Sequence, residues 1–188
     1  VRHFLSSVQR ILGHINYLDE LQIEDRIIKS DIFPLGIDYK KYSKYENNEK
    51  IKKEIASLKK SLGDNKMILS MDRLDYTKGI VERLTAYERF LEKYPEYHEK
   101  VILIIIAVPS RTTVGTYLDL RSQVDELVGK INGQYTTMTW TPIRYLYRSF
   151  PFEEIMAFYN CADVALITPR RDGMNLVAKE YIAAKKDK

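Results

Sequence analysis

Two polar segments of the sequence carry the side chains best suited to binding an anionic ligand. The first segment, 72–79 (DRLDYTKG), supplies the cations Arg73 and Lys78. The second, 168–181 (TPRRDGMNLVAKEY), contains a glycine turn followed by a helix start. Backbone N–H groups in the first turn of a helix are unpaired and partly positive, so together with two cations they suit a diphosphate. We therefore expect the two segments to form one anion site.

Three residues of the second segment have separate expected roles. Gly173 can take backbone angles that other residues avoid, and Asn175 is suited to be the N-cap of the following helix. Glu180 falls one turn after Leu176, on the same face of that helix. A carboxylate on this inner face either points at a ligand or has no use there.

Each cation of the first segment also has a simpler explanation. Taken singly, Arg73 or Lys78 is better explained as a surface cation paired with Asp72 or Asp75. Because the two occur together, after a buried strand and before a helix start, the pattern alone leaves ligand binding and ion pairing evenly balanced. A third loop, 109–111, follows the longest apolar run and brings Arg111 to the same edge of a parallel sheet.

Other motifs that would point to a cofactor or a metal are absent from the sequence. It contains neither the glycine-rich dinucleotide fingerprint nor a P-loop. The three histidines lack the spacing of metal ligands, and no Asp-x-Asp pair occurs to anchor a divalent cation. Cys161 is better explained as a small core residue than as a nucleophile. We therefore expect no metal site and no cofactor.

Composition places the chain among ordinary globular proteins. With 188 residues, 45% apolar and 30% charged, it can form a domain with a sizeable core, alone or with part of another. The net charge of +4 is too mild for a nucleic-acid-binding surface. Its longest apolar run, 101–108, is too short to cross a bilayer. One cysteine and the lack of a leader fit the cytoplasm, and the missing initiator Met suggests a segment of a longer protein.

Hydrophobic periodicity predicts strands that alternate with helices, after an amphipathic N-terminal helix. A turn at 34–38 separates the two parts, and the lysine-rich stretch after it is expected to be a surface helix rather than a binding patch. This order predicts an α/β fold: a Rossmann-like, doubly wound parallel sheet with helices on both faces. The expected helices cover 4–15, 51–62, 80–94, 114–131 (ended by Gly133), 152–160 and 176–185; the expected strands cover 26–33, 66–71, 101–107, 136–141 and 163–167.

Four segments of the sequence, 71–79, 107–111, 129–133 and 171–181, resemble the trehalose-6-phosphate synthase family. Its members are retaining glycosyltransferases with the two-domain GT-B fold. They move glucose from a nucleotide sugar, usually UDP-glucose, to glucose 6-phosphate in trehalose biosynthesis. The resemblance implies that residues 37–188 are the nucleotide-sugar-binding domain, truncated at its C-terminus, and that residues 1–36 are the end of the acceptor domain with the crossover.

The resemblance also assigns roles to individual residues. Arg73 and Lys78 correspond to the pair that holds the donor diphosphate and stabilises departing UDP, and with Asp172 they are the predicted catalytic residues. No protein nucleophile is required if the leaving phosphate takes the acceptor's proton, and the reaction is expected to be metal-independent. The other implied contacts are Phe150 at the nucleotide, Asp172, Gly173, Met174 and Asn175 at the glucosyl group, Leu176 and Val177 under the diphosphate, Glu180 at the ribose hydroxyls, and Arg111 at the acceptor phosphate.

Several alternatives stay open at the level of sequence. The chain could belong to a glucosyltransferase with another acceptor, such as glycerol 3-phosphate, or to a non-catalytic regulatory subunit that only binds the sugar nucleotide. A nucleic-acid-binding α/β module would instead show an affinity that collapses with salt and no response to UDP. The donor base (UDP, GDP or ADP), a following phosphatase domain and homo-oligomer formation are also open. We expect small-molecule substrates, neither nucleic acid nor membrane as a partner, and an isolated segment that is inactive because the cleft needs both halves.

Overall fold

The computed structural model describes residues 1–17, 19–110 and 115–185. Contacts divide the chain into two compact units, Val1–Leu35 and Gly36–Lys188, next to the division that the sequence predicted after residue 36. None of the helices in the described part of the chain is both long and apolar enough to span a membrane.

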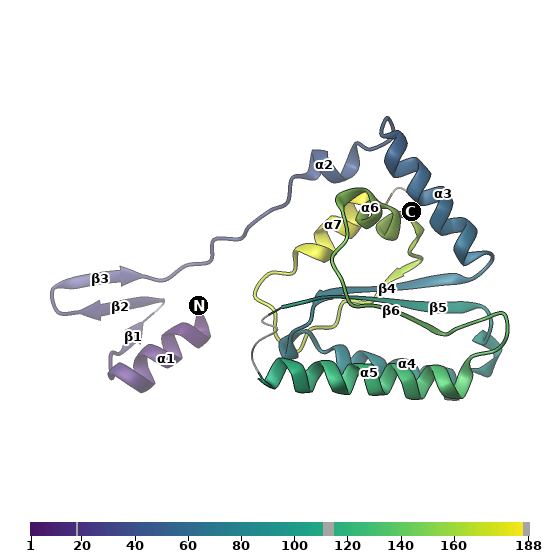
Figure 1. Cartoon of the computed structure of the whole chain (residues 1–188). Coiled ribbons are helices and arrows are strands. Elements are labelled where there is room, and N and C mark those ends of the chain that lie inside the picture. The colour runs from purple at the N-terminus through teal and green to yellow at the C-terminus, as the bar shows by residue number, and fades with distance from the viewer. Residues whose placement is uncertain (18, 111–114, 186–188) are drawn as a thin grey trace. The chain divides into compact units, whose positions relative to one another are not determined.

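The first unit is a short helix with a small antiparallel sheet (Figure 1). Its strands pair in the order β1-β2-β3, and the expected strand over 26–33 is found only as β3. Leu5 and Leu21 are buried, whereas Ile11 and Leu12 remain largely exposed. This unit therefore contributes only a small core of its own. Its elements are α1 (Arg2–Leu12), β1 (Asn16–Tyr17), β2 (Glu20–Ile23) and β3 (Arg26–Lys29).

The second unit is built on a four-stranded parallel sheet with the order β6-β5-β4-β7 (Figure 1). Strands β4 and β5 pair along their whole length. Strand β5 is buried along nearly all of its length, which explains why its sequence is a continuous apolar run rather than an alternating one. The strands are β4 (Lys66–Arg73), β5 (Val101–Val108), β6 (Ile143–Leu146) and β7 (Val164–Ala165).

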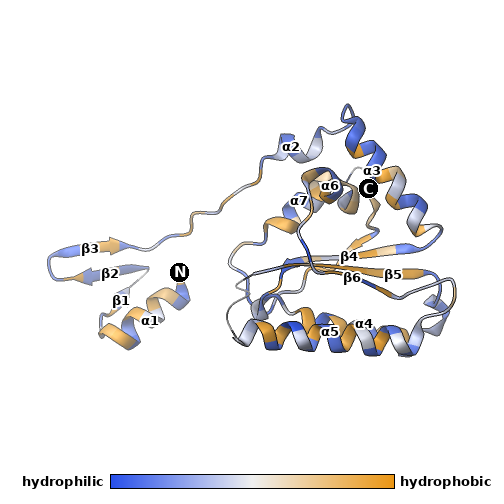
Figure 2. Ribbon diagram, viewed as in Figure 1, coloured by the Kyte–Doolittle hydropathy of each residue, from blue (hydrophilic) through white to orange (hydrophobic). Residues whose placement is uncertain are grey.

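Helices cover both faces of this sheet, which confirms the doubly wound α/β prediction. In Figure 1, α4 and α5 lie on one face, and α3, α6 and α7 lie on the other. Figure 2 shows hydrophobic residues concentrated in the strands and on parts of the covering helices. The helices are α2 (Tyr39–Ser43), α3 (Glu49–Leu62), η1 (Tyr76–Lys78), α4 (Ile80–Lys93), η2 (Pro95–Tyr97), α5 (Gly115–Tyr135), α6 (Phe152–Cys161) and α7 (Leu176–Ala184).

The predicted inner face of α4 is confirmed. Ile80, Leu84, Tyr87 and Leu91 recur at the spacing of one helix face and are all buried. The Tyr87 hydroxyl donates to the Pro142 carbonyl oxygen at 3.2 Å, so its polar end is satisfied inside the core. This packing fixes the helix that follows the first polar segment.

The strand predicted over 136–141 is wrong: the structure places the strand at Ile143–Leu146 instead. Thr137 N–H donates to the Trp140 carbonyl at 2.9 Å, which closes a turn within the predicted stretch. The Trp140 indole N–H in turn donates to the Val101 carbonyl at 2.9 Å. Pairing with β5 therefore begins only after this turn, although Thr136–Thr141 has the β-branched composition of a strand.

The predicted helix end at Gly133 is also wrong, because α5 continues to Tyr135. A glycine inside a helix is only mildly unfavourable, and tertiary contacts outweigh it. The Asn132 amide accepts from Ile143 N–H at 3.0 Å and donates to the Ile143 carbonyl at 2.9 Å. These bonds tie the last turns of α5 to the start of β6.

Candidate functional site

A pocket of about 290 Å³ opens where the two polar segments meet. Strands β4 and β7 are parallel neighbours, so the segments that follow them emerge at the same edge of the sheet. Seven of its eight lining residues are ones that the sequence assigned to the donor site, and Asp72 is the addition. The lining residues are Asp72, Arg73, Lys78, Asp172, Met174, Asn175, Leu176 and Val177.

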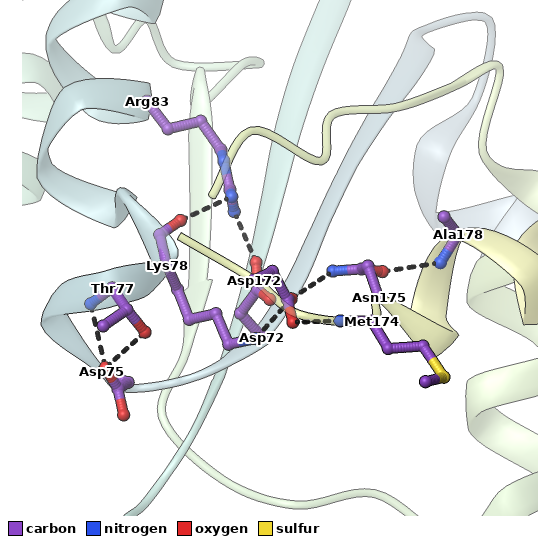
Figure 3. Close-up of polar contacts among 9 residues, drawn as sticks. All are labelled: Asp72, Asp75, Thr77, Lys78, Arg83, Asp172, Met174, Asn175 and Ala178. Atoms are coloured by element: carbon purple, nitrogen blue, oxygen red, sulfur yellow. Dashed lines mark hydrogen bonds and ion pairs between the residues drawn. The ribbon is translucent and has the colours of Figure 1, made fainter. Parts of the chain in front are cut away.

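The first segment is ordered by its own hydrogen bonds (Figure 3). The Asp75 carboxylate accepts from the N–H of Thr77 at 2.9 Å and from its hydroxyl at 2.7 Å, capping η1. Burial acts to raise the pKa of Asp75, but the bonds from Thr77, with a bond from the Tyr117 hydroxyl and the charge of Arg73, outweigh burial and lower that pKa. Arg171 N–H donates to the Thr77 carbonyl at 3.1 Å, so the second segment is joined directly to the first.

Asp172 lies at the centre of the polar contacts within the pocket (Figure 3). Its Oδ2 accepts from Lys78 Nζ at 2.6 Å and from Asn175 Nδ2 at 3.0 Å, and its Oδ1 accepts from Met174 N–H at 3.3 Å. The bond from Lys78 is the main reason that the pKa of Asp172 lies below its usual range. Lys78 therefore pairs with Asp172 rather than with Asp72 or Asp75.

The start of α7 is capped as the sequence predicted. Asn175 Oδ1 accepts from Ala178 N–H at 2.9 Å, and Leu176 and Val177 then line the pocket. The prediction for Gly173 is wrong in its detail, because its φ lies outside the left-handed region. The turn is shaped by the side-chain bonds of Asp172, so a glycine is not required there by backbone angle.

Arg73 is exposed at the end of β4 and lines the pocket. The explanation of Arg73 as the ion-pair partner of Asp72 is not supported, because Asp72 is buried and pairs with Arg83 at 3.0 Å. Asp75 stays open as a partner, since the charge of Arg73 helps to lower its pKa. Arg83 lies on α4 and was not identified from the sequence. It was missed because an arginine among the charged residues of a helix resembles a surface residue. Its partner, Asp72, lies outside the helix, so the sequence of α4 does not indicate the pairing.

Glu180, Phe150 and Gly173 do not line this pocket, and their donor-binding roles stay predictions. The Glu180 carboxylate accepts from the Tyr159 hydroxyl at 2.6 Å. Burial, with Glu180 beside it, raises the pKa of Tyr42 to about 12, so this hydroxyl remains protonated. Phe150 packs edge-on against Phe158, with 5.1 Å between ring centroids.

Two further predictions about the site also have no structural test. Arg111, expected at the acceptor phosphate, lies outside the described residues. Across residues 1–17, 19–110 and 115–185, no group of three or more His, Cys, Asp or Glu side chains is arranged to hold a metal ion. Metal independence itself stays a prediction.

Known proteins resemble this chain along its whole length. The family model described as glycosyltransferase family 20 matches residues 1–188. The 56 kDa subunit of the UDP-forming alpha,alpha-trehalose-phosphate synthase of Saccharomyces cerevisiae is 45% identical over 187 residues, which cover 100% of this chain and 38% of that protein. The chain thus spans about two fifths of this curated relative.

Solved structures share the fold. A structure described as trehalose-6-phosphate from E. coli bound with UDP-2-fluoro glucose is 40% identical, with a TM-score of 0.83 over 92% of this chain and 38% of that one. The N-terminal domain of a Candida albicans trehalose-6-phosphate phosphatase is 31% identical, with a TM-score of 0.90 over 97% of this chain and 39% of that one. The chain therefore belongs to glycosyltransferase family 20, and the sheet and the pocket are consistent with this family.

Proposed function

We propose that this chain supplies the donor site of a retaining glucosyltransferase that moves glucose from UDP-glucose to glucose 6-phosphate. The products are trehalose 6-phosphate and UDP. The observation that carries the proposal is the pocket, because seven of its eight lining residues match the predicted donor contacts. The UDP-forming relative and the neighbour bound with UDP-2-fluoro glucose support UDP as the nucleotide.

In this proposal the charge on the departing UDP is stabilised by the protein and not by a metal. Arg73 and Lys78 supply two cations, and the first turn of α7 at Leu176 and Val177 supplies partly positive N–H groups. These groups stabilise the negative charge that develops as the glycosidic bond breaks. Asp172 contacts the glucosyl group, and the leaving phosphate takes the acceptor's proton.

Replacing Arg73 by alanine is the direct test of the diphosphate assignment. We expect UDP affinity of the intact protein to fall about tenfold, because a charged hydrogen bond to phosphate contributes about 1.5–3 kcal/mol. Isothermal titration calorimetry with UDP measures this. Arg89→Ala is the matched control, since Arg89 is an exposed arginine on α4. Equal affinities for wild type and Arg73→Ala would refute the assignment.

Glu180→Ala tests the ribose assignment separately from the diphosphate. We expect UDP binding to weaken by about 1–3 kcal/mol through the loss of charged hydrogen bonds to the ribose. Pyrophosphate, which has no ribose, should bind the variant as it binds wild type. Calorimetric titrations with both ligands make the comparison, and equal losses for the two would contradict the ribose role.

A second candidate function is a non-catalytic domain that only binds the sugar nucleotide. This candidate is favoured by the likeness to the N-terminal domain of a protein that is described as a phosphatase and not as a synthase. The presence of Arg73, Lys78, Asp172 and Glu180 favours the catalytic function instead, since a domain without activity is free to lose them. Assays of the intact protein with UDP-glucose plus glucose 6-phosphate or glycerol 3-phosphate separate the two functions and also identify the acceptor. A cytoplasmic location and the use of small-molecule substrates belong to the same proposal.

A further inference from the structure

Arg83 is a buried cation that does not line the pocket but contacts the segments that build it (Figure 3). Its side chain is 0% exposed, and that of Asp72 is 3% exposed. The guanidinium donates to the Ser70 hydroxyl, to Asp72 Oδ2 at 3.0 Å, to the Lys78 carbonyl at 3.0 Å and to Thr168 Oγ1 at 3.3 Å. One side chain thus joins β4, η1 and the start of the second segment.

The partner of Arg83 is an acid in the lining of a pocket that we assign to a diphosphate. Burial raises the pKa of Asp72, while Arg83 and then Lys78 act to lower it. Asp172 and the Tyr159 hydroxyl are further titratable groups that interact with Asp72. An unpaired carboxylate here would repel phosphate oxygens, so its neutralisation matters for ligand binding as well as for folding.

We propose that Arg83 is a positioning residue of the donor site: it neutralises Asp72 and anchors the Lys78 and Thr168 segments, so that the pocket accepts a diphosphate. This inference rests on the proposed function. Arg83 does not itself touch the ligand, because its donors are directed to protein acceptors on three segments. Its effect on the ligand passes through the charge of Asp72 and the backbone that carries Lys78.

The test is calorimetric titration of the intact protein with UDP between pH 5 and pH 8. Arg83→Met removes the cation, and we expect its UDP affinity at pH 8 to be at least about tenfold below that of wild type. As the pH falls, Asp72 takes up a proton, its negative charge disappears, and the ratio of the two affinities approaches one. The ratio is compared because UDP itself also titrates in this range. Asp172 stays ionised, since its pKa is lowered.

Three further variants separate charge from other effects. Adding Asp72→Asn to Arg83→Met should restore UDP affinity at pH 8 and remove the pH dependence of the ratio. Arg83→Lys keeps the charge but cannot make all the same bonds, so its affinity should stay within about threefold of wild type while kcat falls. Arg89→Met is the control on the same helix and should match wild type. If Arg83→Met does not fold, the UDP affinities of the double variant and of Arg83→Lys still test whether Arg83 acts through the charge of Asp72.

The outcomes distinguish a failure of this inference from a failure of the proposed function. If wild type binds UDP, and a folded Arg83→Met binds it equally well, the inference is overturned. The inference is also overturned if Arg83→Met loses UDP affinity and neither low pH nor Asp72→Asn restores it. It is likewise overturned if Arg83→Lys binds UDP as weakly as Arg83→Met. In both cases the role of Arg83 is only structural. A wild-type protein that does not bind UDP overturns the proposed function, and this inference with it.

Discussion

Replacing Lys78 by methionine should lower kcat for glucosyl transfer by about 10²–10³-fold, the range found when one preorganised group that stabilises developing charge is removed. Lys78 is held in the pocket by its bond to Asp172 at 2.6 Å, and its side chain is only 14% exposed. Water therefore screens poorly the attraction between this ammonium group and a phosphate that enters the pocket, and the Asp172 carboxylate offsets only part of that attraction. Because charge builds on that phosphate as the glycosidic bond breaks, kcat should fall more than UDP affinity.

Initial rates of UDP release from UDP-glucose, with saturating glucose 6-phosphate, measure this effect on the intact protein. Lys53→Met is the matched control, because Lys53 is an exposed lysine on α3 and the substitution is the same. Circular dichroism checks that both variants fold. A folded Lys78→Met enzyme whose kcat lies within about threefold of wild type would show that Lys78 does not stabilise the leaving group.

Local signals in the sequence were sufficient to predict most of the second unit. Burial of a strand on both faces produces a continuous apolar run, as at Val101–Val108. Burial of one face of a helix produces apolar residues at helical spacing, as in α4. Both patterns can be recognised in the sequence itself. The N-cap at Asn175 could also be predicted, because it depends only on residues next to it in the sequence. The pocket was predictable because strand order alone brings the two polar segments to one edge of the sheet.

Features that depend on distant contacts were missed. The position of β6 is set by pairing with β5 and by the buried Trp140, so local composition pointed to the wrong residues. Arg83 was missed because its burial follows from acceptors on other segments. Its partner Asp72 was treated as a surface acid because it was placed in the polar segment after the buried strand, whereas β4 extends to Arg73 and includes it.

Gly79→Ala is expected to reduce both stability and UDP binding, because two separate constraints require a glycine at this position. Gly79 has φ 66° and ψ 34°, in the left-handed region, where a residue with a Cβ costs about 1–2 kcal/mol. A Cβ there would also lie 2.7 Å from the Thr168 carbonyl oxygen, which belongs to the backbone. We therefore expect the free energy of unfolding to fall by about 2 kcal/mol or more.

Relief of that contact requires the Thr168 backbone to move, and this backbone leads to Asp172 in the pocket. Urea unfolding followed by the fluorescence of Trp140, the single tryptophan and a buried residue of the second unit, measures the stability. Gly63→Ala is the control, since Gly63 also has a positive φ of 59° but no atom near its Cβ position. It should lose stability through its backbone alone and keep wild-type UDP affinity. If Gly79→Ala keeps both the stability and the UDP affinity of wild type, the close approach of the two segments does not constrain the site.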